Sequence, residues 1–152
     1  MSLMITQEEA DELLQMLKSC VSTFLNLPSI GNREQFELTA INNKSKRFMV
    51  SVNRANKFVE KISFTALYKE KNIRLLRLDI NPTQKHTNPI QLGGEELIGT
   101  HLHIYKEGFH DKYAIPFDVT NPQLEKIFFS FLEQFNVIKI PPIRVQISDK
   151  EV

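Results

Sequence analysis

The sequence has little cysteine and no long apolar run. Cys20 is the single cysteine among 152 residues, so an intrachain disulfide is excluded. No stretch approaches the roughly 18 consecutive apolar residues that a membrane-spanning helix needs. The opening MSLMITQEEADELL has neither the basic start nor the apolar centre of a secretory signal. These absences predict a cytoplasmic protein with no membrane partner, and Cys20 is interpreted as a half-buried small residue.

The common short catalytic motifs are absent as well. There is no CxxC, HExxH or GxSxG, and LGGEELIG at residues 92–99 lacks the spacing and the lysine of a phosphate-binding loop. Motifs therefore leave open whether the protein is an enzyme, and they name no cofactor. The chain also shows no internal repeat and no low-complexity linker, which predicts one domain over residues 1–152.

Charge is unevenly distributed along the chain. The net charge is +1, yet residues 44–77 hold ten basic and two acidic side chains, so this segment carries +8. Such a segment can form a basic face that attracts an anion or a nucleic acid. We expect Lys44 and Arg47 to contact that ligand. The alternative is that lysine-rich strand edges and turns prevent edge-to-edge pairing of sheets.

Hydrophobic periodicity predicts two amphipathic helices around a run of strands. Residues 7–26 carry apolar side chains at helical spacing after a Thr6/Glu9 capping box. A second helix is expected over residues 121–136, capped by Asn121 or Thr120 with Pro122 in its first turn. Its four phenylalanines between positions 128 and 135 are expected to fill the core.

Between these helices, residues 35–118 alternate between apolar and polar side chains and are joined by short turns. This pattern predicts a mostly antiparallel sheet, and a short terminal strand is expected near residues 143–147. The fold class is therefore α+β, with both helices packed on one sheet face.

Chemistry concentrates in GTHLHIYKE, residues 99–107. On a strand, His101, His103, Tyr105 and Glu107 would share one face, because side chains alternate. On the preceding strand Arg77 and Asp79 lie opposite the core side. Pairing of these strands would bring the histidines, Arg77 and Asp79 together on a solvent-side surface. The long connection 81–99 carries His86 and Asn88, and we expect it to fold over that surface.

Three functions compete for this cluster. In the first, a divalent metal is bound by His101 and His103, with Glu107 or His86 as third ligand. The spacing His-x-His-x3-Glu is similar to the first half of the cupin metal motif over seven residues. However, that motif's leading glycine would fall at Glu95, and no second motif follows.

In the second, a metal-free site binds or cleaves a phosphodiester, as a ribonuclease does. His101 and His103 would supply acid and base, with His86 closing the site. Arg77 would stabilise charge on phosphate, and Asp79 would orient an imidazole. Tyr105 and Asn88 would contact the substrate. In the third, the face is the solvated side of a sheet or a contact surface for a protein partner.

The residues of this cluster also carry a family resemblance. RLDINP, HTNP and GTHLHIYKEGFHDKYAIPF resemble an uncharacterised family of small bacterial proteins, some borne by phages or mobile elements. Arg77 and Asp79, then His86 and Asn88, then His-x-His-Ile-Tyr with Glu107 match its pattern over residues 75–117. The resemblance implies a bacterial origin and no particular activity.

Overall fold

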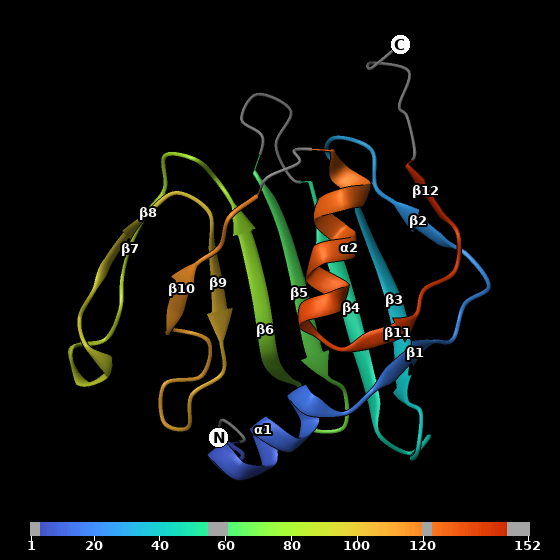
Figure 1. The fold of residues 1–152 in the computed structure, drawn as a ribbon, viewed down its shortest axis with the longest axis horizontal. Coiled ribbons are helices and arrows are strands. Elements are labelled where there is room, and N and C mark those ends of the chain that lie inside the picture. Colours follow the sequence, from blue (N-terminus) through green and yellow to red (C-terminus); the bar gives the residue numbers. More distant parts are fainter. Residues whose placement is uncertain (1–3, 55–60, 120–122, 146–152) are drawn as a thin grey trace.

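The computed structural model describes residues 4–54, 61–119 and 123–145, and it confirms the predicted α+β single domain. An eight-stranded sheet has the order β10-β9-β6-β5-β4-β3-β1-β11. Its neighbouring strands are antiparallel except for the β1–β11 pair. Helix α2 lies across one face of this sheet (Figure 1).

The sheet strands are β1 (Lys18–Cys20), β3 (Arg33–Ala40), β4 (Arg47–Asn53), β5 (Ile62–Tyr68), β6 (Ile73–Ile80), β9 (His101–Ile104), β10 (Ala114–Pro116) and β11 (Val137–Lys139). The remaining elements are α1 (Gln7–Gln15), β2 (Leu25–Leu27), β7 (Lys85–Thr87), the 3-10 turn η1 (Ile90–Leu92), β8 (Glu96–Ile98), α2 (Leu124–Gln134) and β12 (Ile143–Val145).

The core lies between the sheet and α2, and aromatic rings fill it. The ring centroids of Phe131 and Phe64 are 5.6 Å apart, and those of Phe135 and Phe48 are 5.5 Å apart, within the range that aromatic pairs favour. Phe128 is buried as well, whereas Phe129 is 42% exposed. The prediction that all four phenylalanines fill the core is therefore wrong for Phe129, which lies off the apolar stripe of the helix.

The first helix is shorter than predicted. Thr6 caps it by accepting a hydrogen bond from the Glu9 amide, as expected, but α1 ends at Gln15. The predicted helix is wrong over residues 16–26, which form β1, β2 and their connection. Ser19, Ser22 and Thr23 are weak helix formers, and β1 gains hydrogen bonds by pairing with both β3 and β11.

Lys18 connects the ends of both helices inside the core. Its side chain is fully buried, and its Nζ donates to the carbonyls of Leu14, Met16 and Phe135 at 3.1, 2.8 and 2.9 Å. A cation suits this position because helix C-termini carry partial negative charge. Burial lowers the pKa of Lys18 to about 7.

At the C-terminal part of the chain, the structure keeps the predicted helix and strand with different limits. Helix α2 begins after Gln123 and ends at Gln134, while the predicted cap and Pro122 lie outside the described residues. The terminal strand is confirmed as β12, which pairs in parallel with β2; residues 146–147 lie outside the described part. None of the described helices has the length and hydropathy needed to cross a membrane.

Candidate metal centre

The centre is built where β6 and β9 pair. Arg77 lies opposite His103 in the ladder and Asp79 lies opposite His101, as the sequence predicted. The difference is burial: His101 and His103 are 0% and 2% exposed, where a solvent-side surface was expected. These imidazoles face the side of the sheet away from α2, and another segment of the chain covers them.

That segment is the connection between β6 and β9. It forms the β7–β8 hairpin, which brings His86 against both buried rings. The His86 ring centroid lies 5.2 Å from that of His101 and 4.9 Å from that of His103. The predicted folding-over of His86 is therefore seen, although the connection is a hairpin with its own ladder.

Asn88 fixes this hairpin to β10. Its side chain donates to the Ala114 carbonyl and accepts from the Ala114 amide, both at 2.8 Å. Asn88 is 3% exposed, so these bonds lie out of water and hold the hairpin firmly. The residue expected to contact substrate is thus a support for His86.

Each of the three rings donates one N–H to a backbone carbonyl. His101 Nδ1 lies 2.8 Å from the Gly99 oxygen, His103 Nδ1 lies 2.7 Å from the Asp111 oxygen, and His86 Nε2 lies 3.0 Å from the Lys112 oxygen. A carbonyl oxygen only accepts, so these nitrogens carry the protons. In the neutral rings, His101 Nε2 and His86 Nδ1 keep their lone pairs. His103 Nε2 faces both Arg77 Nη2 and Asp79 Oδ2, so it accepts from Arg77 when the ring is neutral and donates to Asp79 when the ring is protonated.

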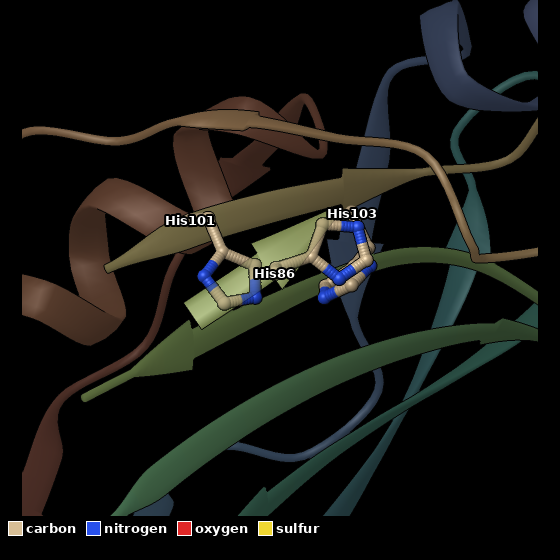
Figure 2. A group of neighbouring side chains, drawn as sticks. All are labelled: His86, His101 and His103. Carbon is tan, nitrogen blue, oxygen red and sulfur yellow. The ribbon is translucent and has the colours of Figure 1, made fainter. Parts of the chain in front are cut away.

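The three rings lie close together. One nitrogen of each lies within 4.8 Å of one nitrogen of the other two, the His86 and His101 rings are stacked at an interplanar angle of 18°, and Figure 2 shows the three neighbouring side chains. His101 Nε2 is buried without a hydrogen-bond partner; within the described ranges the same is true only of Arg77 Nε. Buried polar atoms are almost always paired, so both exceptions in one cluster mark it as a site.

Charged groups surround the rings on the β6 side. Asp79 Oδ2 lies 3.3 Å from His103 Nε2 and 3.8 Å from His101 Nε2. Arg77 Nη2 lies 3.1 Å from His103 Nε2, and its Nη1 contacts Asp111 Oδ2 at 2.7 Å. The cluster therefore holds a cation between two carboxylates beside the imidazoles.

Two pKa values respond to this environment. Burial lowers the pKa of His101, and the neighbouring His103 lowers it further, although the Gly99 hydrogen bond opposes this. Burial opposes ionisation of Asp79, but the His103 hydrogen bond and the Arg77 charge outweigh it and lower the pKa of Asp79. A neutral imidazole and an ionised carboxylate are therefore favoured side by side at neutral pH.

Two predicted members lie elsewhere. Strand β9 ends at Ile104, so the alternation does not continue to Tyr105, which is fully buried and donates its hydroxyl to the Ile5 carbonyl. Glu107 accepts from the Gln7 amide at the start of α1. Of the two third ligands that the metal hypothesis named, His86 lies in the cluster and Glu107 does not.

Asp111 belongs to the surroundings of the histidines, although this was not predicted from the sequence. Its carbonyl orients His103, and its carboxylate binds Arg74 and Arg77. The β9–β10 hairpin explains this, since Ala114 pairs with His103. The sequence feature that could have indicated this role is the position of Asp111, three residues before Ala114, which pairs with His103.

Part of the basic segment 44–77 is paired with carboxylates in the fold. Arg47 pairs with Glu70, Lys69 with Glu37, and Lys71 with Glu9. Ser51 of β4 pairs with Thr65 of β5, which pairs with Arg77 of β6. Arg47 lies four residues before Ser51 on β4 and is therefore well away from Arg77. Lys44 is exposed in the β3–β4 turn. Neither Lys44 nor Arg47 is therefore part of the histidine cluster.

Comparison with known proteins gives a family but no activity. No curated protein and no solved structure matches the chain. A family model described as a family of unknown function (DUF6978) matches residues 5–137, which include every residue of the histidine cluster. The chain belongs to this family of unknown function.

Proposed function

We propose that this protein binds a divalent transition-metal ion, zinc in the first instance, through His86, His101 and His103. The observation that carries the proposal is the grouping of three imidazoles, each held by a carbonyl at one nitrogen, with the second nitrogen of His101 buried and without a hydrogen-bond partner. Metal-binding histidines almost always donate their second ring nitrogen to a carbonyl or carboxylate in this way. Three histidines and one open position form a common catalytic zinc site.

The dimensions support this assignment. Zinc–nitrogen bonds of about 2.1 Å place tetrahedral ligands roughly 3.4 Å apart, while the three nitrogens here lie within 4.8 Å. Closing this difference requires the stacked His86 and His101 rings to rotate when the metal binds. The lowered pKa of His101 also favours the neutral ring that a metal requires.

Asp79 and Arg77 give the site two further capabilities. The Asp79 carboxylate lies within 4 Å of two imidazole nitrogens, so it is placed to be a fourth ligand or to accept a proton from a metal-bound water. Arg77 contacts His103 Nε2, the nitrogen that a metal would take. Metal binding therefore replaces this contact and leaves the guanidinium to its two carboxylates.

The direct experiment is zinc titration by calorimetry of the metal-free full-length chain without an affinity tag. The expected result is one zinc ion per chain in the wild type and a loss of affinity of more than 100-fold in His86→Ala. His86 is chosen because it lies on a half-buried hairpin, so the fold survives its truncation. His101→Ala and His103→Ala are expected to lose zinc as well.

The fourth histidine provides a matched control. His110 lies outside the cluster and has φ +53°, a backbone conformation that asparagine tolerates. His110→Asn should therefore bind zinc as the wild type does. A wild-type chain that binds no zinc, cobalt, manganese or iron would overturn the proposal, and so would a His86→Ala chain of unchanged affinity.

A second candidate is metal-assisted phosphodiester cleavage, which differs from the metal-free ribonuclease hypothesis drawn from the sequence by giving the histidines to the metal. It is supported by the position of Arg77 and Asp79, a cation for phosphate and a carboxylate for a proton, directly beside the histidine pair. The expected result is ribonuclease activity that zinc restores to the metal-free chain and that His101→Ala abolishes. Activity retained in a folded His101→Ala chain would exclude the role given to His101.

A further inference from the structure

The face of the sheet opposite α2 carries a polar groove that begins at the histidine cluster. The groove has a volume of about 510 Å³ and lies over β3, β4, β5 and β6, with Arg77 and Asp79 in its lining. It lies on the face opposite α2, since its lining side chains alternate with the buried core residues of the same strands. Arg77 and Asp79, which contact the histidine rings, thus also line the groove.

Strand register arranges the groove into two rows that cross five strands. Neighbouring residues are directly paired in the ladders. The first row consists of Arg33, Asn53, Ser63, Asp79 and His101. The second row consists of Gln35, Ser51, Thr65, Arg77 and His103. Each row spans four strand spacings, roughly 19 Å.

The net positive charge of the groove lining favours an anionic ligand. Three arginines, Arg33, Arg74 and Arg77, line it against one carboxylate, Asp79. Arg33 is exposed, and no described carboxylate lies within ion-pairing distance of it. Arg74 is largely exposed and holds Asp111 only at 3.4 Å. Exposed pairs of this kind are weak, so both guanidinium groups are available to an anion.

The uncharged polar side chains that line the groove indicate how it would hold its ligand, which is by hydrogen bonds. Hydroxyl and amide side chains such as Ser51, Asn53 and Thr65 hydrogen-bond phosphates and sugars. None of the described residues that line the groove is aromatic, so stacking of bases on these side chains does not contribute. An elongated ligand with repeated negative charges and hydroxyls fits this groove, which has Arg33 at its β3 end and Arg74 and Arg77 at its β6 end.

We propose that this groove binds single-stranded nucleic acid by its sugar–phosphate backbone, with one phosphate at Arg77 beside the metal centre. The inference deepens the proposed function, because it gives the metal centre a ligand. Arg77 contacts His103 and lies in the groove lining, so it is the residue where the two parts meet. Binding is expected to depend little on base sequence and strongly on salt.

The test is fluorescence anisotropy with a labelled ten-nucleotide uridine RNA and the zinc-loaded full-length chain at low salt. Arg33→Gln and Arg74→Gln should each weaken binding several-fold, and the double variant at least tenfold. Each substitution should also lower the slope of log affinity against log salt by roughly 0.7. Both positions are exposed, so these chains should fold as the wild type does.

Lys139→Gln is the matched control. It removes one positive charge from exposed β11, at the far edge of the sheet from the histidine cluster, and should leave RNA affinity unchanged. An equal loss of RNA affinity in Lys139→Gln and Arg33→Gln would show that binding depends on net charge alone, and it would contradict the proposal that RNA binds in the groove. Failure of the wild type to bind the RNA, equal binding of a duplex, or full competition by inorganic phosphate would also overturn the proposal.

Zinc content measured on the same samples separates the two proposals. Wild-type chain that binds zinc but not RNA contradicts only the groove. Chain that binds RNA through Arg33 and Arg74 but takes up no metal contradicts the proposed function and leaves the groove assignment supported. The arginine variants should retain full zinc content, since neither side chain is a member of the histidine cluster.

Discussion

Two buried polar clusters of this protein can be compared directly, one around Lys18 and one around His101. The ammonium of Lys18 has three donors and three carbonyl acceptors, so its capacity for hydrogen bonds is used up. His101 has one nitrogen bonded to the Gly99 carbonyl and one buried nitrogen with no partner. Both side chains are fully buried.

The number of unpaired atoms distinguishes a buried polar group that stabilises the fold from one that is available to a ligand. A fully paired cluster stabilises the fold, and its loss leaves several buried carbonyls without donors. A cluster with a free lone pair contributes less to stability, but it keeps the capacity to bind a ligand. A substitution at Lys18 is therefore expected to destabilise the fold, whereas a substitution at His101 is expected to abolish ligand binding and leave stability nearly unchanged.

The largest effect is expected for Lys18→Met. Three buried carbonyl oxygens would lose their donor, which we expect to destabilise the protein by about 3–5 kcal/mol. Denaturant unfolding monitored by circular dichroism measures this. A loss below about 1 kcal/mol would show that the carbonyls find other partners.

The pH dependence of stability tests the same residue. Burial lowers the pKa of Lys18 from 10.5 to about 7. Between these values the unfolded chain binds a proton that the folded chain has released, so unfolding free energy should rise with pH. Below about pH 7 the ammonium is present in both states and the trend ends. The rise should be missing from Lys18→Met.

A smaller effect is expected for Asn88→Ala, which acts on the support of the histidine cluster. The buried Ala114 amide would lose its acceptor, at a cost of about 1–3 kcal/mol. Zinc affinity should fall roughly 10–100-fold, because His86 would lose its fixed orientation. Thr87→Ala, an exposed neighbour, is the control and should change neither quantity.

His101→Leu should be close to neutral for metal-free stability. The substitution removes an unpaired buried nitrogen, which favours the folded chain, and also the hydrogen bond to the carbonyl of the half-buried Gly99, which disfavours it. Because these two changes oppose each other, unfolding free energy should change by less than about 1 kcal/mol. The stabilisation by zinc that the wild type shows should disappear. A metal-free loss as large as that of Lys18→Met would mean that both clusters are structural.

The smallest effect concerns Cys20, a half-buried residue of β1 that belongs to neither cluster. Burial raises the pKa of its thiol to about 11, so the reactive thiolate is scarce at pH 8.5. Alkylation of the folded chain should be on the order of a hundredfold slower than that of an ordinary free cysteine. Denaturation should restore the ordinary rate.

Local patterns predicted most of the sheet and the paired part of the site. Period-two alternation placed Arg77 and Asp79 on the face of His101 and His103, and the ladder register agrees. Such patterns work because strand side chains have a fixed period that neighbouring strands share. The capping box at Thr6 was predicted correctly for the same reason: its hydrogen bond joins residues three positions apart.

Contacts between distant segments were not predictable in the same way. Residues 16–26 have helical spacing of apolar side chains, yet β1 gains more by pairing with β3 and β11, since tertiary pairing overrides weak local propensity. Burial of the histidines was missed because the β7–β8 hairpin covers them. Asp111 was missed because its role depends on the β9–β10 register.

The sequence by itself determined the fold class, the face on which the polar residues lie, and the neighbours of His101 and His103. Each of these follows from the period of side chains along a strand or a helix. Only the tertiary structure decided which of His86 and Glu107 completes the cluster, and which ring nitrogens stay free. Those outcomes depend on carbonyl groups from separate turns, whose positions are set by the packing of the whole chain.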